Sequence, residues 1–132
     1  MPMASILLID EYDGFRAVMA YCLPKFGHTV CCVADVEAAL QAGRTRAVDL
    51  VLLDLGRPWP SGLAGCERLR GHPVFATKPI VLLTDGPVET IARRGLAAGA
   101  VETLAKPFQW PDLLAVIERW CPSPPSVAGD GL

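Results

Sequence analysis

The amino-acid sequence predicts a doubly wound α/β fold, in which a five-stranded parallel sheet lies between two layers of helices. Short continuous apolar runs, which are typical of strands covered on both faces, recur along the chain. Segments whose apolar residues are spaced as on one face of a helix alternate with these runs. Because the crossovers between parallel strands are right-handed, such an alternation folds into one sheet with helices on both sides.

The composition is that of a single globular domain. The chain has 132 residues, of which 52% are hydrophobic, and this is enough to bury a core. A net charge of −2 argues against a protein that binds nucleic-acid backbones. No apolar run approaches the ~20 residues of a membrane-spanning helix, and no secretory signal opens the chain. We therefore expect a cytoplasmic protein with no direct nucleic-acid or membrane partner.

The first predicted strand, residues 5–9, ends at two acids. The helix after it carries five apolar residues on one face, namely Phe15, Val18, Met19, Cys22 and Phe26. Pro24 should loosen the last turn of this helix just before Gly27, a suitable C-terminal residue. The second strand is predicted at 29–34. Asp35 could cap the short helix that follows, from residue 36 to about residue 43.

The third strand is predicted at 50–53 and ends at Asp54. A loop rich in Gly and Pro follows at 56–62, where Trp59 is expected to lie partly over the site, and a helix is expected around 63–70. The later elements are a strand at 80–83 that ends at Thr84, a helix from about 88 to 98, a short strand at 102–104, and a last helix with Pro111 in its first turn.

Side chains at the carboxyl ends of parallel strands gather in one crevice, where ligands bind. In this chain those ends carry five polar residues, namely Asp10, Glu11, Asp54, Thr84 and, just past the fifth strand, Lys106. Three carboxylates in one crevice repel each other unless a cation neutralises them. Mg²⁺ suits them, because it prefers oxygen ligands, binds one or two carboxylates and leaves room for a phosphoryl oxygen.

The other residues of the crevice suit a phosphoryl group. Thr84 and Lys106 supply a hydroxyl and an ammonium as donors to phosphoryl oxygens. Asp54 follows the third strand, at the centre of the sheet, and is the natural nucleophile. The sequence therefore indicates a site that forms an aspartyl-phosphate.

In this order and at this spacing, the residues resemble the receiver domain of two-component response regulators. The resemblance covers about residues 5–121, so we expect the domain at 1–121 and a disordered tail or linker at 122–132. Its motifs are the acidic pair Asp10-Glu11, Asp-Leu-x-x-Pro from Asp54, the later Gly62, Thr84, Gly-Leu-Ala-Ala-Gly-Ala at 95–100, and Lys-Pro-Phe at 106–108.

The resemblance implies a CheY-like, flavodoxin-like fold with strand order 2-1-3-4-5. It implies that Asp54 accepts a phosphoryl group from a sensor histidine kinase or a histidine phosphotransfer protein. The implied metal site is Mg²⁺ held by Asp10, Glu11, Asp54 and the carbonyl of Gly56. Thr84 and Lys106 would bind phosphoryl oxygens, and the Lys106–Pro107 peptide bond would be cis.

Receivers act as switches rather than as enzymes. Their only chemistry is autocatalytic phosphoacceptance and slow self-dephosphorylation. Phosphorylation would shift a two-state equilibrium that an output partner protein or effector domain reads. The face built by the fourth helix, the fifth strand and the fifth helix would carry this readout, and it also allows a homodimer.

Several positions depart from the family pattern. Glu11 stands where a shorter Asp is usual, and Thr103 replaces an aromatic whose rotation accompanies activation. Gly56 and Gly86 occupy positions whose side chains commonly tune dephosphorylation. Asp85 follows Thr84 where a small residue is usual, and two roles are open for it. It either points into the crevice and slows phosphorylation, or turns outward and caps the next helix.

Two rival functions follow from these observations. The departures at Asp85 and Thr103 are compatible with a degenerate receiver-like interaction module that does not depend on phosphorylation. A small flavodoxin-like enzyme or cofactor binder would have the same architecture. It is disfavoured because acids, rather than a Gly-rich or Ser/Thr-rich phosphate loop, follow the first strand.

Overall fold

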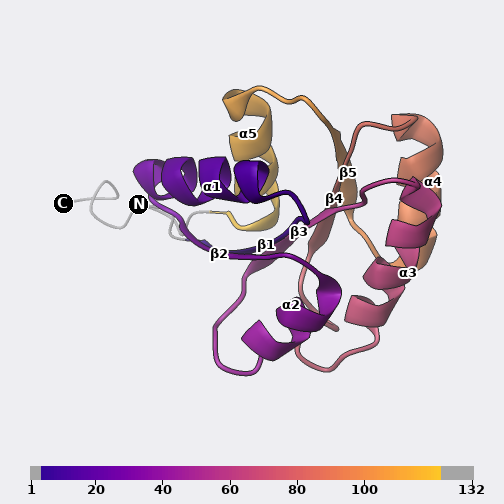
Figure 1. Ribbon diagram of the computed structural model, residues 1–132, viewed down its shortest axis with the longest axis horizontal. Helices are drawn as coiled ribbons and strands as arrows, with labels where there is room; N and C mark the ends of the chain where they lie inside the picture. The colour runs from indigo at the N-terminus through magenta and orange to yellow at the C-terminus, as the bar shows by residue number, and fades with distance from the viewer. Residues whose placement is uncertain (1–3, 123–132) are drawn as a thin grey trace, which may run out of the picture.

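The computed structural model describes residues 4–122. Its five strands form one parallel sheet in the order β2-β1-β3-β4-β5, with helices on both faces (Figure 1). The predicted fold class and strand order are therefore confirmed. The strands are β1 (Ser5–Ile9), β2 (Thr29–Val33), β3 (Leu50–Asp54), β4 (Ile80–Thr84) and β5 (Glu102–Ala105). The helices are α1 (Asp13–Cys22), the 3-10 helix η1 (Leu23–Phe26), α2 (Val36–Ala42), α3 (Trp59–Arg70), α4 (Val88–Ala98) and α5 (Trp110–Trp120).

The sheet separates two hydrophobic cores, because successive side chains of a strand point to opposite faces. Leu7 and Ile9 of β1 pack in the core beneath α2, α3 and α4, whereas Ile6 and Leu8 pack in the core beneath α1 and α5. Figure 1 shows α1 and α5 together on one side of the sheet, with α2 and α3 on the other. The apolar strands are thus covered on both faces, which leaves only the ends of the sheet for a polar site.

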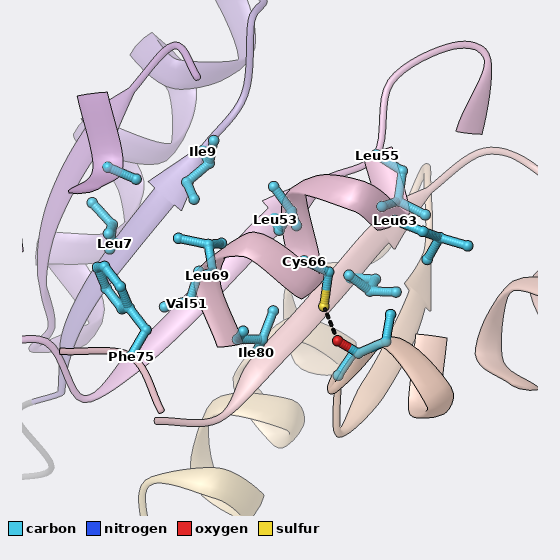
Figure 2. Packing of buried hydrophobic residues seen from close by; sticks show 14 of the residues in the cluster. Leu7, Ile9, Val51, Leu53, Leu55, Leu63, Cys66, Leu69, Phe75 and Ile80 are labelled. Atoms are coloured by element: carbon cyan, nitrogen blue, oxygen red, sulfur yellow. Dashed lines mark hydrogen bonds between the residues drawn. The ribbon is translucent and has the colours of Figure 1, made fainter. Parts of the chain in front are cut away.

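Helix α3 packs directly on the centre of the sheet. Figure 2 shows Leu63, Cys66 and Leu69 of α3 turned toward the side chains of the central strands. Cys66 is fully buried, and its thiol donates a hydrogen bond to the carbonyl of Ala98 at the end of α4 (3.5 Å). Gly62 permits the close approach of α3, since a Cβ on it would lie 2.5 Å from the carbonyl oxygen of Leu55.

One helix confirms a detail of the sequence prediction, and another differs from it. The first helix is α-helical only as far as Cys22 and continues as the 3-10 turn η1, which contains Pro24 and ends at Gly27 with φ of 90°. The loosened turn was expected, since proline cannot donate the helical hydrogen bond.

Helix α3 begins at Trp59, four residues before the predicted start at residue 63, so the placement of Trp59 in a loop was wrong. Pro60 in the first turn does not hinder the helix, because the first N–H groups have no intrahelical partner anyway.

Other local features agree with the prediction. Asp35 caps α2, since its carboxylate accepts a hydrogen bond from the N–H of Ala38 (2.8 Å). The Lys106–Pro107 peptide bond is cis as expected, and so is Arg57–Pro58. Among residues 4–122, no helix combines the length and the apolar character that crossing a membrane requires.

His28 is a buried, structural histidine at the start of β2. Its side chain is 6% exposed, and its Nδ1 accepts a hydrogen bond from the backbone N–H of Ala4 (3.2 Å). Burial lowers the pKa of His28 below its usual 6.5, although the charge of Glu118 opposes this shift. The unfolded chain therefore binds a proton at this residue more readily than the folded chain. Its contribution to stability is present above about pH 6.5 and is lost as the pH falls through the lowered pKa.

We expect the melting temperature of the protein to fall more steeply between pH 7.5 and pH 5 than that of a His28→Asn variant. Asparagine can accept the same hydrogen bond from Ala4 but does not titrate in this range. Thermal unfolding of both proteins at several pH values tests this. If the melting temperatures of the two proteins changed in parallel with pH, the lowered pKa assigned to His28 would be contradicted.

Candidate functional site

The polar residues predicted to share a crevice lie at one end of the sheet. Asp10 directly follows β1, Asp54 and Thr84 are the last residues of β3 and β4, and Lys106 directly follows β5. The strand register aligns these ends, because Asp54 pairs with Leu83 and Thr84 pairs with Ala105. The parallel topology therefore gathers residues that are up to 96 positions apart in the sequence.

Lys106 bridges two carboxylates at the centre of this site. Its ammonium donates hydrogen bonds to Oδ1 of Asp54 (3.0 Å) and to Oδ2 of Asp10 (3.4 Å). The Asp10 side chain is fully buried and that of Asp54 is 6% exposed. The ammonium also lies 4.0 Å from the centre of the Phe15 ring, in a cation–π contact. These contacts hold the lysine toward the acids rather than toward solvent.

The environment shifts the pKa of both Asp54 and Lys106. Burial raises the pKa of Asp54, and the hydrogen bond and charge of Lys106 only partly oppose it. For Lys106, burial alone would lower the pKa, but Asp54 and Asp10 outweigh burial and raise it. Lys106 is therefore cationic at neutral pH, and Asp54 is more basic than an ordinary aspartate. A carboxylate that is both basic and poised beside a cation suits nucleophilic attack on an anionic centre.

Backbone groups orient the remaining oxygens of the two aspartates. The N–H of Tyr12 donates to Oδ1 of Asp10 (2.8 Å), and the N–H of Gly56 donates to Oδ2 of Asp54 (3.1 Å). Each carboxylate thus has one oxygen on the Lys106 ammonium and the other on a neighbouring backbone N–H. This fixes both side chains before any ligand arrives.

The four residues of the expected metal site share one cavity. Asp10, Glu11, Asp54 and Gly56 all line a cavity of about 280 Å³. Glu11 reaches toward Gly56, since a Cβ on that glycine would lie 3.3 Å from Oε1 of Glu11. Carboxylate and carbonyl oxygens are the donors that Mg²⁺ prefers, so the residues fit this ion. Within residues 4–122, however, no three acidic, histidine or cysteine side chains are already close enough to hold a metal.

Thr84 is at its expected strand end, and its hydroxyl oxygen bonds to the loop that follows β4. The side chain is buried, and its Oγ1 accepts a hydrogen bond from the N–H of Gly86 (3.0 Å). Thr84 is also absent from the residues that line the cavity beside Asp54. The structure therefore brings Asp54 and Lys106 into contact, whereas Thr84, the last residue of β4, bonds to the β4–α4 loop.

Arg57 is a residue of the site that the sequence analysis missed. A smaller cavity of about 50 Å³ lies beside Asp54, lined by Tyr12, Asp54, Gly56, Arg57, Asp85 and Lys106. Nε and Nη2 of Arg57 both donate to Oδ2 of Asp85, at 3.1 and 2.5 Å. This ion pair lowers the pKa of Asp85. The sequence did contain a signal for this pair, because an unusual acid, Asp85, follows Thr84 and a cation, Arg57, lies three residues after Asp54.

The ion pair places Asp85 differently from both predicted alternatives. The cap alternative was wrong, because Pro87 is the N-cap residue of α4 and no side chain caps this helix. The carboxylate does line the cavity beside Asp54, as the first alternative required. It does not add an isolated negative charge there, because the Arg57 guanidinium binds it.

Trp59 packs on the β4–α4 loop at the first turn of α3. A Cβ on Gly86 would lie 3.1 Å from Cδ1 of Trp59 and 3.3 Å from Oγ1 of Thr84. The guanidinium of Arg94 in α4 lies 5.0 Å from the centre of the Trp59 ring. The indole thus connects the segment around Thr84 to α4, whereas the sequence indicated only a partial cover over the site.

The fold and this site define a class of α/β domain with a lysine-bridged pair of aspartates at the carboxyl end of a parallel sheet. The response regulator receiver domain family matches residues 6–118, and the chain belongs to that family. It is a receiver domain of two-component response regulators, and the degenerate alternative is not favoured.

Curated relatives agree with this assignment. The chain is 32% identical over 113 residues to the phosphate regulon transcriptional regulatory protein PhoB of Rhizobium meliloti, covering 86% of this chain and 50% of that protein. It is 34% identical over 131 residues to the transcriptional regulatory protein TcrA of Mycobacterium tuberculosis, covering 95% and 51%. The chain therefore spans about half the length of these relatives, which are regulators rather than conventional enzymes.

Solved structures of receiver domains superpose on the chain. The chemotaxis response regulator CheY4 of Vibrio cholerae has a TM-score of 0.80 at 27% identity, covering 89% of this chain and 98% of that one. The receiver domain of a sensor histidine kinase from Pseudomonas aeruginosa has a TM-score of 0.77 at 28% identity, covering 91% and 98%. That receiver domain is described with a magnesium ion coordinated in its active-site cleft.

Proposed function

We propose that Asp54 accepts a phosphoryl group in a Mg²⁺-dependent reaction, from a sensor histidine kinase or a histidine phosphotransfer protein. The observation that supports this proposal is the Lys106 ammonium, which bridges Asp54 and Asp10 at the end of the sheet. A basic carboxylate with a cation at hydrogen-bond distance is the arrangement that in-line attack on a phosphoryl group needs.

In the proposed step, a carboxylate oxygen of Asp54 forms a bond to phosphorus as the bond from phosphorus to the donor's imidazole nitrogen breaks. The electron pair of the broken bond goes to that nitrogen. Lys106 moves from pairing the two acids to pairing the phosphoryl oxygens. Thr84, whose oxygen accepts the bond from Gly86, donates its hydroxyl proton to a phosphoryl oxygen. Asp10, Glu11, Asp54 and the carbonyl of Gly56 would hold Mg²⁺, which when bound would supply positive charge beside the phosphoryl oxygens.

Loss of the phosphoryl group by self-hydrolysis is expected to be slow. Gly56 and Gly86 flank Asp54 and Thr84 and have no side chains with which to position an attacking water. Phosphoacceptance and this slow hydrolysis are the whole of the proposed chemistry.

The proposed output is a change in the affinity of the chain for a partner protein or effector domain. The matched relatives are about twice as long as this chain, which is compatible with an effector beyond the receiver at 1–121. The predicted tail at 122–132 lies, apart from Pro122, outside the described residues. Readout or homodimerisation through the α4–β5–α5 face, and a cytoplasmic location, belong to the same proposal.

Binding of beryllofluoride, an analogue of a bound phosphoryl group, separates this function from a phosphate-independent interaction module. With Mg²⁺ present, we expect amide chemical-shift changes centred on Asp54, Thr84 and Lys106. An unchanged spectrum at saturating Mg²⁺ and beryllofluoride would contradict the proposal.

The length of Glu11 gives a separate prediction about the metal. Mg²⁺ requires near-ideal octahedral geometry at ~2.0–2.1 Å, and the shorter aspartate is usual at this position in the family. We therefore expect Glu11→Asp to retain or tighten Mg²⁺ binding in a calorimetric titration. A tenfold loss of affinity, ~1.4 kcal/mol, would mean that Glu11 is adapted to this site and that the prediction is wrong.

A further inference from the structure

The Arg57–Asp85 ion pair joins two loops at the entrance to the acceptor site. Arg57 lies in the β3–α3 loop, three residues after Asp54, and Asp85 lies in the β4–α4 loop, directly after Thr84. Both residues line the 50 Å³ cavity that Asp54 and Lys106 also line. Their side chains are 76% and 46% exposed, so solvent and an incoming donor can reach both of them.

Lys106 and Arg57 differ in how firmly the protein holds them. The Lys106 side chain is 21% exposed, and its ammonium is already bonded to both aspartates. The bonds from Arg57 to Asp85 use two of the five N–H donors of the guanidinium, and both end on one carboxylate oxygen. Arg57 is therefore restrained only by an exposed pair with a single oxygen, which an incoming anion can displace.

We propose that Arg57 is a binding residue for the phosphoryl group of the incoming donor, and that Asp85 competes with the donor for it. A phosphoryl group can accept two parallel hydrogen bonds from the planar guanidinium, as a carboxylate does. In the resting protein Asp85 occupies Arg57. When a donor arrives, its phosphoryl oxygens replace Oδ2 of Asp85 on the guanidinium and are guided toward Asp54.

This role differs from simple repulsion by Asp85. An unpaired carboxylate beside Asp54 would repel an anionic donor whether or not Arg57 were present. A carboxylate that acts by occupying Arg57 has no effect once Arg57 is removed. The inference rests on the proposed phosphorylation of Asp54, and it concerns the phosphoryl group itself, whether that group is carried by a small donor or by a phosphohistidine.

A double-mutant cycle tests the competition, with phosphoramidate as donor at a concentration below saturation and Mg²⁺ at saturation. We expect Asp85→Ala to label about threefold faster than the unsubstituted chain, the size expected of one exposed ion pair. Arg57→Ala should label at least threefold more slowly. The double variant should match Arg57→Ala. Arg46→Ala, which removes an exposed arginine between α2 and β3, controls for net charge and should label normally.

A second readout does not depend on turnover. Asp85→Ala should tighten beryllofluoride binding and Arg57→Ala should weaken it, and both effects should shrink at high salt, since the pair is exposed.

Other results of the cycle would overturn the inference. Faster labelling of Arg57→Ala would mean that the pair only blocks the entrance. If Asp85→Ala raised the labelling rate equally with and without Arg57, Asp85 would act by direct repulsion of the donor. If Arg57→Ala labelled at the normal rate, Arg57 would not contact the donor. Failure of the unsubstituted chain to label at Asp54 would instead contradict the proposed function, and this inference with it.

Discussion

Replacement of Asp54 by asparagine should abolish phosphorylation. The amide has the shape of the carboxylate and can still accept the hydrogen bond from the N–H of Gly56. It lacks the nucleophilic oxygen that would form the bond to phosphorus, and Asp10, the other aspartate on Lys106, is fully buried. Transfer should therefore be lost entirely rather than slowed.

The Asp54→Asn variant should remain folded and be at least as stable as the parent at neutral pH. Burial raises the pKa of Asp54 in the folded state, so its ionised form is disfavoured by folding. The contribution of Asp54 to stability falls as the pH rises from its pKa in the unfolded chain through its raised pKa in the folded chain. Asparagine does not ionise and so avoids this destabilisation. Lys106 keeps its bond to Asp10.

Intact-mass spectrometry after incubation with phosphoramidate and Mg²⁺ measures this loss. Asp13→Asn is a matched control, because Asp13 is 92% exposed and pairs with Arg16, outside the acceptor site. The control should gain the mass of one phosphoryl group as the parent does. Undiminished labelling of Asp54→Asn would contradict the assignment of the acceptor.

Replacement of Lys106 by methionine should slow phosphoryl transfer by about 100-fold, the effect of removing one fixed donor from a developing oxyanion. Methionine fills a similar volume but supplies no cation to Asp54 or to the phosphoryl oxygens. Mg²⁺ affinity should not fall, because the ammonium competes with a metal for the oxygens of Asp10 and Asp54. The variant thus separates metal binding from phosphoryl stabilisation.

The stability of Lys106→Met should depend on Mg²⁺ more strongly than that of the parent. Without metal, two buried carboxylates lose their cation, and breaking such a contact is destabilising. Added Mg²⁺ should raise the melting temperature of the variant more than that of the parent. A transfer rate within a few-fold of the parent, or weaker Mg²⁺ binding, would contradict the role given to Lys106.

The fold could be predicted from the sequence because its signals are local and agree with one another. Each strand is a short apolar run, and each crossover carries its own helical periodicity. Side chains that alternate between two covered faces leave few ways to arrange the sheet. The position of the site followed from the fold, since parallel strands bring Asp54, Lys106 and the acids after β1 to one end.

The parts that could not be predicted depend on side chains that meet across loops. The Arg57–Asp85 pair joins the β3–α3 and β4–α4 loops, and neither loop has a periodicity that reports its partner. The hydrogen bond that Thr84 accepts from the N–H of Gly86 likewise depends on the path of the β4–α4 loop. Trp59 was placed in a loop because Pro58 and Pro60 are turn residues, although proline is equally suited to the first turn of a helix.

The proposed Mg²⁺-dependent phosphorylation of Asp54 can be measured on the unsubstituted chain. Its mass is determined after incubation with phosphoramidate, with Mg²⁺ or with a chelator, and the modified residue is then mapped. We expect a gain of one phosphoryl group that requires Mg²⁺ and maps to Asp54. No gain, a gain that persists with the chelator, or a phosphoryl group only at another residue would contradict this.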